Sequence, residues 1–327
     1  MKPKIIISTP IYSNKRHPRC YCCLELIESI RLQLPKDSYL HIIVNDGSTD
    51  NTANILKKVS QKDQNLIVIN HKKKDGTYAF NLGIDISVSP QKYKHLLTRN
   101  NFRKIVKLDP TLIYFIGVDD LVGPNFYKKL KEANKYPLNT KVFMGHYRSF
   151  LMDEPYSQKE YTPYLPDLKK YLRLLFYVEN FPSHTLIFRK DFVQKIRNSR
   201  KSQFGILHPK ILSPVVYELM LQATELAILN NYNFAFLKGN IGYKRYGIRG
   251  TMTEKNKKAG RYLEERESVF KRHILFAKEH KIAYFKKRPT LKKKYFKPLR
   301  TDRHLVFDKC LKNIFDLTKA NYSNLVS

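Results

Sequence analysis

The chain has 327 residues, enough for one large domain or two small ones with a substantial buried core. Its 42% hydrophobic content argues against wholesale disorder, and no apolar run approaches the ~20 residues that span a bilayer. Lys and Arg number 61 against 28 Asp and Glu, and the formal charge of +33 favours nucleic acid, an anionic membrane surface or a phosphorylated substrate as partner.

Strand and helix signals alternate over about the first 120 residues, as in an α/β fold. The N-terminal apolar stretch is too short for a signal peptide and leads directly into a strand. Predicted strands cover 4–8, 40–45, 65–70 and 111–118, and predicted helices cover 20–34, 51–60 and 77–86. The first helix holds three of the four cysteines without metal-ligand spacing, which indicates reduced thiols in a reducing compartment. The basic segment 87–110 is predicted to be an inserted loop or helix.

Beyond residue 140 the pattern is less regular. Strand-like runs cover 141–150, 183–192 and 232–240, and an amphipathic helix covers 213–231. From about residue 254 the chain is helical and basic, and residues 281–300 carry Lys and Arg with no acid. We therefore predict an α/β domain over 1–253 and a basic helical region over 254–327.

Polar residues follow four of the predicted strands or strand-like runs. They lie at 9–12, 45–48, 75–76 and 119–120. Because ligands of open α/β sheets bind outside the carboxyl ends of the strands, four polar loops at one edge predict one site.

The segment VNDGSTDNT, residues 44–52, has a simple structural explanation. It is a tight turn in which Ser48 or Thr49 caps the next helix, although a turn does not require Asp46 at the strand tip. Asp119 and Asp120 are the stronger signal, because adjacent carboxylates at a strand end repel unless something positive neutralises them. A divalent cation, Mg²⁺ or Mn²⁺, shared with a diphosphate is the natural partner, and an ordinary acidic turn is the alternative.

In this order, TPIYS, VNDGSTDNT, AFNLGI and FIGVDDLVGP resemble the motifs of family 2 glycosyltransferases of the GT-A fold. The resemblance covers residues 4–130 well and 180–255 weakly. It implies a mostly parallel, Rossmann-like sheet flanked by helices, with a nucleotide-binding half over 1–130 and an acceptor-binding half over 131–253. Asn45 departs from the first acid of the family's D-D-G-S motif, and Gly117 departs from the first acid of D-x-D-D.

The resemblance also implies a role for each matching position. Its nucleotide-sugar contacts fall on Thr9, Pro10, Tyr12, Asp46, Asp75 and Asp119. Asp46 would hydrogen-bond the base, usually uracil. Asp119 and Asp120 would hold the metal, Mn²⁺ or Mg²⁺, which neutralises the diphosphate as it departs.

Two segments concern residues that could bind the phosphates of the donor. Phe80 stands where an arginine often precedes the Asn of the family's helix motif, so one phosphate contact is missing. The segment 242–253, GYKRYGIRGTMT, resembles the family's Tyr-Arg-x-His segment near the active site. Lys244, Arg245 or Arg249 could therefore reach phosphate instead.

An inverting, single-displacement transfer needs a base that deprotonates the acceptor hydroxyl. In this family an acid at the start of a later helix serves, and the position that matches is Glu218. The alternative is a solvated helix glutamate. Rival bases are Glu225 and the pair Asp153 and Glu154.

The sequence thus predicts a metal-dependent glycosyltransferase that moves a sugar from a UDP-sugar to a glycan or lipid-linked acceptor in surface polysaccharide biosynthesis. It predicts a cytoplasmic protein whose basic C-terminal region binds the anionic inner face of the plasma membrane rather than nucleic acid, with a merely solvated lysine-rich surface as the alternative. A nucleotidyltransferase of the same fold stays open, although it would normally show a Gly-rich phosphate loop after the first strand. A non-catalytic basic protein that binds nucleic acid or membranes also stays open, although it would not need carboxylates at the strand ends.

Overall fold

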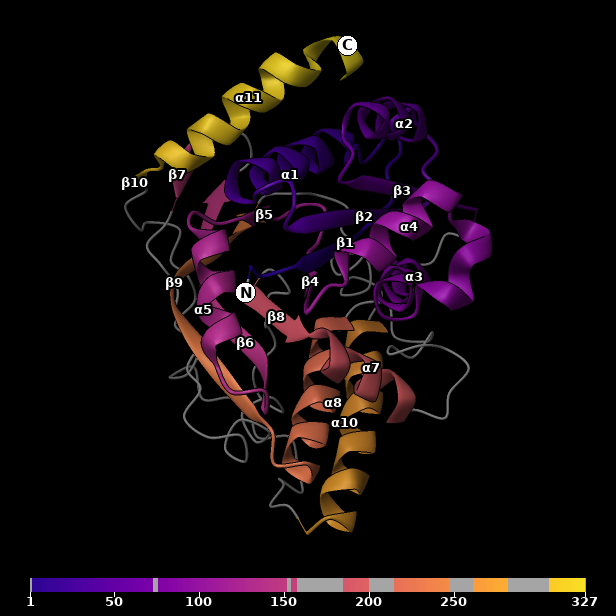
Figure 1. The fold of residues 1–327 in the computed structure, drawn as a ribbon, viewed down its shortest axis with the longest axis vertical. Helices are drawn as coiled ribbons and strands as arrows, with labels where there is room; N and C mark the ends of the chain where they lie inside the picture. Colours follow the sequence, from indigo (N-terminus) through magenta and orange to yellow (C-terminus); the bar gives the residue numbers. More distant parts are fainter. Residues whose placement is uncertain are drawn as a thin grey trace.

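The computed structural model describes residues 2–72, 76–151, 154–157, 185–199, 215–246, 261–281 and 306–326. Strands and helices alternate through the first part of the chain (Figure 1). The elements there are β1 (Ile5–Ile11), α1 (Cys20–Gln33), β2 (Tyr39–Asp46), α2 (Thr52–Lys62), β3 (Leu66–His71), α3 (Gly76–Val88), the 3₁₀ helix η1 (Pro90–Leu96), α4 (Arg99–Leu108) and β4 (Leu112–Phe115). The predicted α/β pattern is confirmed, and the inserted segment 87–110 is largely helical.

The second part of the chain adds strands of mixed direction and longer helices. Its elements are β5 (Leu121–Val122), α5 (Phe126–Lys135), β6 (Thr140–Leu151), β7 (Tyr156–Ser157), β8 (Leu186–Arg189), α7 (Lys190–Ser199), α8 (Val215–Leu229), β9 (Asn233–Tyr246), α10 (Arg261–Glu279), β10 (Val306–Phe307) and α11 (Lys309–Val326). The predicted strand at 183–192 is wrong in its last residues. There α7 begins, and Asp191 in its first turn suits the positive end of the helix dipole.

One sheet connects the strands in the order β10-β7-β6-β8-β4-β1-β2-β3, and β9 pairs with β5 and β6. The four neighbours β4, β1, β2 and β3 are parallel, whereas β8 runs antiparallel to β4. The carboxyl ends of β1, β2, β3 and β4 therefore lie at the same edge of the sheet, as the sequence predicted.

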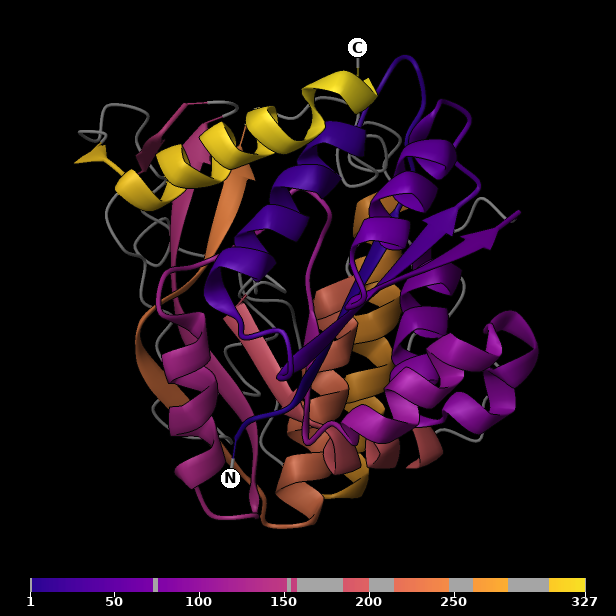
Figure 2. The ribbon, with the colours of Figure 1, turned by 45° about the horizontal axis from the view of Figure 1, so that its top comes forward.

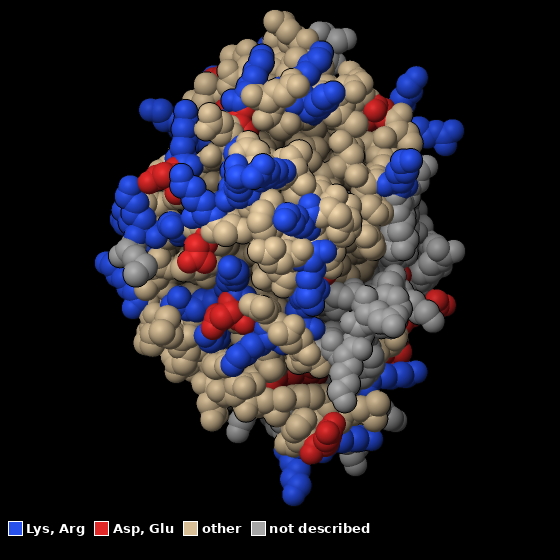
Figure 3. Space-filling view, turned by 45° about the vertical axis from the view of Figure 1, so that its right-hand side comes forward, with Lys and Arg blue, Asp and Glu red and all other residues tan. Residues whose placement is uncertain are grey.

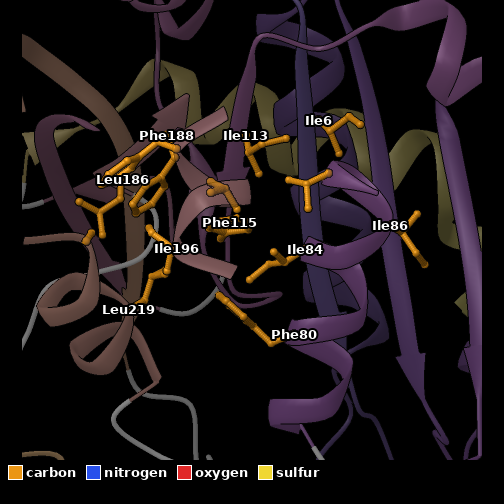
Figure 4. Packing of buried hydrophobic residues seen from close by; sticks show 14 of the residues in the cluster. Ile6, Phe80, Ile84, Ile86, Ile113, Phe115, Leu186, Phe188, Ile196 and Leu219 are labelled. Carbon is orange, nitrogen blue, oxygen red and sulfur yellow. The ribbon is translucent and has the colours of Figure 1, made fainter. Parts of the chain in front are cut away.

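Helices cover both faces of the sheet. Consecutive residues of a strand point to opposite faces, so β1 contributes apolar side chains to a cluster on each side. Ile6 faces a cluster that includes side chains of α3, α7 and α8, and Figure 4 shows Phe80, Ile84 and Leu219 within it. Ile5 and Ile7 face the opposite cluster, which includes side chains of α1, α5 and α11. The strands are thus apolar on both faces, which accounts for their unbroken apolar runs.

The C-terminal helix α11 lies along α1 (Figure 2). Leu311 and Ile314 share one apolar cluster with residues of α1, and the Tyr322 hydroxyl donates a hydrogen bond to Glu28 Oε1 at 2.6 Å. Asp308 begins this helix, because its Oδ1 accepts the backbone N–H of Cys310 at 3.0 Å. The last helix therefore shares a hydrophobic core with the first part of the chain.

The predicted basic region extends beyond what the structure describes, because residues 282–300 lie outside the described ranges. In the part of the chain that is described, no helix is long and apolar enough to cross a membrane.

Candidate active site

The register of the parallel strands brings three of the predicted loops together. Ile11 at the end of β1 pairs with Asn45 of β2, and Asp46 pairs with His71 at the end of β3. Ser8 of β1 pairs with Phe115, the last residue of β4, after which the chain leads to Asp119. Asp75, in the fourth predicted loop, lies outside the described residues.

The loop after β2 owes its shape to an amide rather than a carboxylate. Asn45 donates from Nδ2 to Asn70 Oδ1 at 2.8 Å, and its Oδ1 accepts the backbone N–H of Ser48 at 3.2 Å. An ionised aspartate at this position would accept only and would lose the bond to Asn70. Gly47 follows with φ +70°, and a Cβ there would lie 3.3 Å from the Lys72 carbonyl oxygen. Asn45 thus keeps the acceptor oxygen that closes the turn and adds a hydrogen bond to Asn70 of β3.

Ser13 joins the loop after β1 to the loop after β2. Its backbone N–H donates to Ser48 Oγ at 3.0 Å, and its hydroxyl donates to Asp50 Oδ2 at 2.5 Å. Asp50 Oδ1 also accepts the N–H of Thr52 at 3.1 Å at the start of α2. The prediction that Ser48 or Thr49 caps this helix is therefore wrong, because the side-chain acceptor at its first turn is Asp50 and the Ser48 hydroxyl is used by Ser13.

Asp46 lies beside an aromatic pair that the sequence reasoning missed. Its side chain is buried, and its Oδ1 lies 3.8 Å from His71 Nδ1. The His71 ring stacks on Tyr78 with ring centroids 4.4 Å apart. In the sequence, the one sign of this pair is that His71 and Tyr78 flank the loop after β3. Asp46, His71 and Tyr78 thus form a wall with one carboxylate and two rings.

The three site residues predicted at the end of β1 differ in how exposed they are to solvent. Thr9 is fully buried, and its Oγ1 shares a hydrogen bond with His41 Nε2 at 3.0 Å. Burial lowers the pKa of His41 to about 3, so that imidazole is neutral at pH 7. Pro10 is half-buried and Tyr12 is exposed. Tyr12 therefore offers a side chain to the open edge, whereas the Thr9 hydroxyl is used inside the sheet.

Asp119 and Asp120 lie in a turn after β4, closed by the Asp120 N–H, which donates to the Gly117 carbonyl at 3.1 Å. Arg19 Nη1 lies 3.3 Å from Asp119 Oδ1, and the Arg245 N–H donates to Asp120 Oδ1 at 3.4 Å. Arg19 thus places positive charge directly against Asp119, whereas Arg245 contacts Asp120 through its uncharged backbone N–H and its guanidinium acts on the Asp119 carboxylate through the electric field. Arg245 is predicted from the sequence only as one of three candidate phosphate contacts, and Arg19 is not among the predicted site residues.

Burial raises the pKa of Asp119 to about 6, and the charge of Asp120 adds to this rise, while Arg19 and Arg245 oppose it. The Oδ1 atom of Asp119 is buried and accepts no hydrogen bond, although it faces Arg19. An ionised carboxylate in this setting gains from a further cation.

These two carboxylates fit a divalent cation. Among the described residues, no group of three or more His, Cys, Asp or Glu side chains forms a ready-made metal cage. Carboxylate oxygens are nevertheless the ligands that Mg²⁺ and Mn²⁺ prefer, and Mg²⁺ is commonly bound by one or two carboxylates plus substrate phosphates. Asp119 and Asp120 are the residues that would hold the ion.

The turn continues into β5, which pairs closely with β9. A Cβ at Gly123 would lie 2.7 Å from the backbone nitrogen of Gly242, so glycine allows this close approach. The pairing places Leu121 opposite Tyr243, two residues before Arg245. This is why a residue so distant in sequence reaches the Asp119 turn.

The predicted base and its rivals are described in part. Glu218 is fully buried in the first turn of α8, and Glu225 is half-buried about two turns later on the same helix. Glu154 is exposed, whereas Asp153 and Arg249 lie outside the described residues. Lys244 is half-buried on β9.

Residues 22–197 match the family model described as glycosyl transferase family 2. The chain belongs to glycosyl transferase family 2. The match covers more than half of the chain, from α1 to α7, and includes Asp46 and both residues of the Asp119–Asp120 turn. No curated protein matches the chain.

Solved structures resemble this family 2 chain at low identity. The mannosyltransferase PcManGT from Pyrobaculum calidifontis, in complex with GDP-Man and Mn²⁺, has a TM-score of 0.51 at 12% identity and covers 100% of this chain and 77% of its own. S. aureus TarS 1-349 in complex with UDP-GlcNAc has a TM-score of 0.43 at 16% identity over 77% of this chain. The chain spans 60% of that TarS chain. The likeness to PcManGT shows the fold, in agreement with the predicted GT-A architecture.

Proposed function

We propose that this chain transfers a sugar from a nucleotide-diphosphate donor to a hydroxyl group. The observation that carries the proposal is the placement of Asp46 and the Asp119–Asp120 turn at one edge of the sheet, in a member of glycosyl transferase family 2. A base-binding carboxylate at one strand end and metal-binding carboxylates at another suit the two ends of a nucleotide diphosphate. Family membership favours this reaction over a nucleotidyltransferase or a non-catalytic binding protein.

The proposed donor is a UDP-sugar. The Asp46 carboxylate can accept the N3–H of uracil, and the stacked rings of His71 and Tyr78 offer aromatic surface beside it. Tyr12 is exposed just after β1, at the same edge of the sheet. Guanine also carries ring and exocyclic N–H donors, so a GDP-sugar is the second candidate. The PcManGT structure, which contains GDP-Man and Mn²⁺, supports a nucleotide-sugar donor and a divalent ion for this fold.

The transfer itself is a single displacement with inversion at the anomeric carbon. Glu218 takes the proton of the acceptor hydroxyl, and the hydroxyl oxygen forms a bond to the anomeric carbon. At the same time the bond between the anomeric carbon and the diphosphate oxygen breaks. The nucleoside diphosphate leaves with the bonding electrons. A bound Mn²⁺ or Mg²⁺ at Asp119 and Asp120 would neutralise the charge that develops there.

Calorimetric titration of the purified protein with UDP, GDP and CDP, each with and without Mn²⁺, tests the donor. We expect UDP to bind in the presence of Mn²⁺ and to bind more weakly without it, because diphosphate and carboxylates repel. Asp46→Ala should weaken UDP binding and reduce the preference for UDP over CDP. Wild-type protein that binds none of the three nucleotides with Mn²⁺ would contradict the proposed function.

The proposed acceptor is a glycan or a lipid-linked glycan at the cytoplasmic face of the membrane, in surface polysaccharide biosynthesis. Lys and Arg far outnumber Asp and Glu on the face in Figure 3. Five exposed basic residues lie on η1 and α4: Lys92, Lys94, Arg99, Arg103 and Lys107. Such a surface is attracted to anionic lipid.

Vesicle flotation tests the membrane part of this proposal. The protein should float with vesicles rich in phosphatidylserine and not with neutral vesicles, and added salt should release it. Tight retention on duplex DNA without any flotation would instead support the nucleic-acid alternative.

A further inference from the structure

Beneath the Asp119–Asp120 turn lies a buried ion pair between two elements far apart in sequence. Arg245 of β9 and Glu25 of α1 form it, and their side chains are 0% and 1% exposed. Removing two charges from water is costly, and the attraction between the charges often does no more than offset this cost. Stability alone therefore does not explain why the charges lie there.

The pair contacts the backbone of the turn. Arg245 Nε donates to the Asp119 carbonyl oxygen at 3.1 Å, and the Arg245 backbone N–H donates to Asp120 Oδ1 at 3.4 Å. One residue thus contacts both acids of the turn, and Glu25 binds the guanidinium of that residue.

Helix α1 also contacts the chain just after the turn. Ser29 Oγ accepts the backbone N–H of Val122 at 3.1 Å. Ser29 follows Glu25 by one helical turn, so both side chains lie on the same face of α1. The turn is therefore anchored to α1 at two places, directly at Val122 and through Arg245 at Asp119.

The geometry explains why the residue is an arginine. Its guanidinium donates to Glu25 through Nη2 and to the Asp119 carbonyl through Nε, and its Cζ lies 4.7 Å from the centroid of the Phe150 ring. A planar fork can make both bonds and lie over a ring at the same time, whereas a lysine ammonium cannot.

We propose that Glu25 and Arg245 are positioning residues for glycosyl transfer. They hold the Asp119–Asp120 turn in the position from which its carboxylates would bind a metal ion shared with the diphosphate. This inference rests on the proposed function. It also gives Arg245 a role different from the phosphate contact for which it is one of three candidates, because its guanidinium bonds to Glu25 and to the Asp119 carbonyl.

The chain offers a matched control on the same helix. Glu28 lies three residues after Glu25 and is also buried, and it pairs with Arg31 Nη1 at 2.6 Å and with the Tyr322 hydroxyl. Its partners belong to α1 and α11 and not to the turn. Removing Glu28 should therefore lower stability without moving the acids.

The experiment compares Glu25→Gln and Glu25→Ala with Glu28→Gln and Glu28→Ala, by titration of UDP with Mn²⁺ and by hydrogen exchange of the peptide that covers 117–122. We expect the Glu25 variants to weaken UDP binding about 10- to 100-fold, the usual cost of losing a group that orients metal ligands. The same variants should exchange faster at the turn. The Glu28 variants should unfold at lower temperature yet bind UDP as the wild type does. Arg245→Lys should resemble the Glu25 variants.

Glu25→Gln keeps the size and an acceptor oxygen, so it provides the test if Glu25→Ala does not fold. Folded Glu25 variants with wild-type UDP affinity and wild-type exchange at the turn would overturn the inference. Weakened binding in the Glu28 variants to the same extent would also overturn it, because the effect would then be one of general stability. Failure of the proposed function is distinct, since wild-type protein would then bind no nucleotide.

Discussion

Replacing Asp119 with asparagine is expected to remove metal-dependent nucleotide binding and, at the same time, to stabilise the protein at about pH 7.5. The amide keeps the shape of the carboxyl but cannot hold the ion, so UDP binding with Mn²⁺ and sugar transfer should each fall about 100-fold or more. Titration calorimetry measures the first loss and a transfer assay the second.

The stability gain follows from the direction of the pKa shift. The pKa of Asp119 rises from 3.8 to about 6 on folding, so the folded state binds the proton more tightly. The stabilising contribution of the protonated form is present below about pH 4 and is lost as the pH rises through about 6. The difference corresponds to about 3 kcal/mol by which ionised Asp119 lowers the free energy of unfolding.

Thermal unfolding at two pH values tests whether ionised Asp119 destabilises the folded state. Asp119→Asn should unfold at a higher temperature than wild type at about pH 7.5, and the two should converge at about pH 4. Ser13→Ala, which removes a loop contact without changing charge, provides a control whose effect should not depend on pH in this way. A variant that is less stable than wild type at about pH 7.5 would contradict the expectation.

Replacing Glu218 with glutamine is expected to lower kcat about 10²- to 10⁴-fold, the usual contribution of a positioned proton acceptor. An amide cannot take the proton of the acceptor hydroxyl, whereas it preserves the size of this fully buried side chain. Donor binding should be unchanged, because the base acts on the acceptor. Steady-state kinetics together with UDP titration separates the two effects.

Glu225→Gln is the matched control, because Glu225 lies on the same helix about two turns later. It should retain nearly wild-type turnover. Normal turnover in Glu218→Gln would remove Glu218 as the base, and a loss confined to Glu225→Gln would assign the role to that residue.

The strands and the position of the site could be predicted because their signals are local. Unbroken apolar runs mark strands that are buried on both faces, and the acids of D-G-S-T-D and of Asp119–Asp120 directly follow such runs. Parallel neighbours align their carboxyl ends, so polar residues after several strands meet at one edge. The roles of individual residues in the loop after β2 could not be predicted from the sequence. Asp50 rather than Ser48 supports the start of α2, because Ser13 from another loop uses the Ser48 hydroxyl.

By itself, the sequence determined that this chain forms an α/β sheet with acids at its strand ends, because periodicity and turn chemistry act over a few residues. Only the tertiary structure decided what surrounds those acids. Glu25 and Arg245 are 220 residues apart, and Glu28 and Tyr322 are 294 apart, so no local pattern links them. Their meeting depends on the pairing of β9 with β5 and on the packing of α11 along α1. The arrangement of strands therefore decides that Arg245 lies next to the Asp119–Asp120 turn.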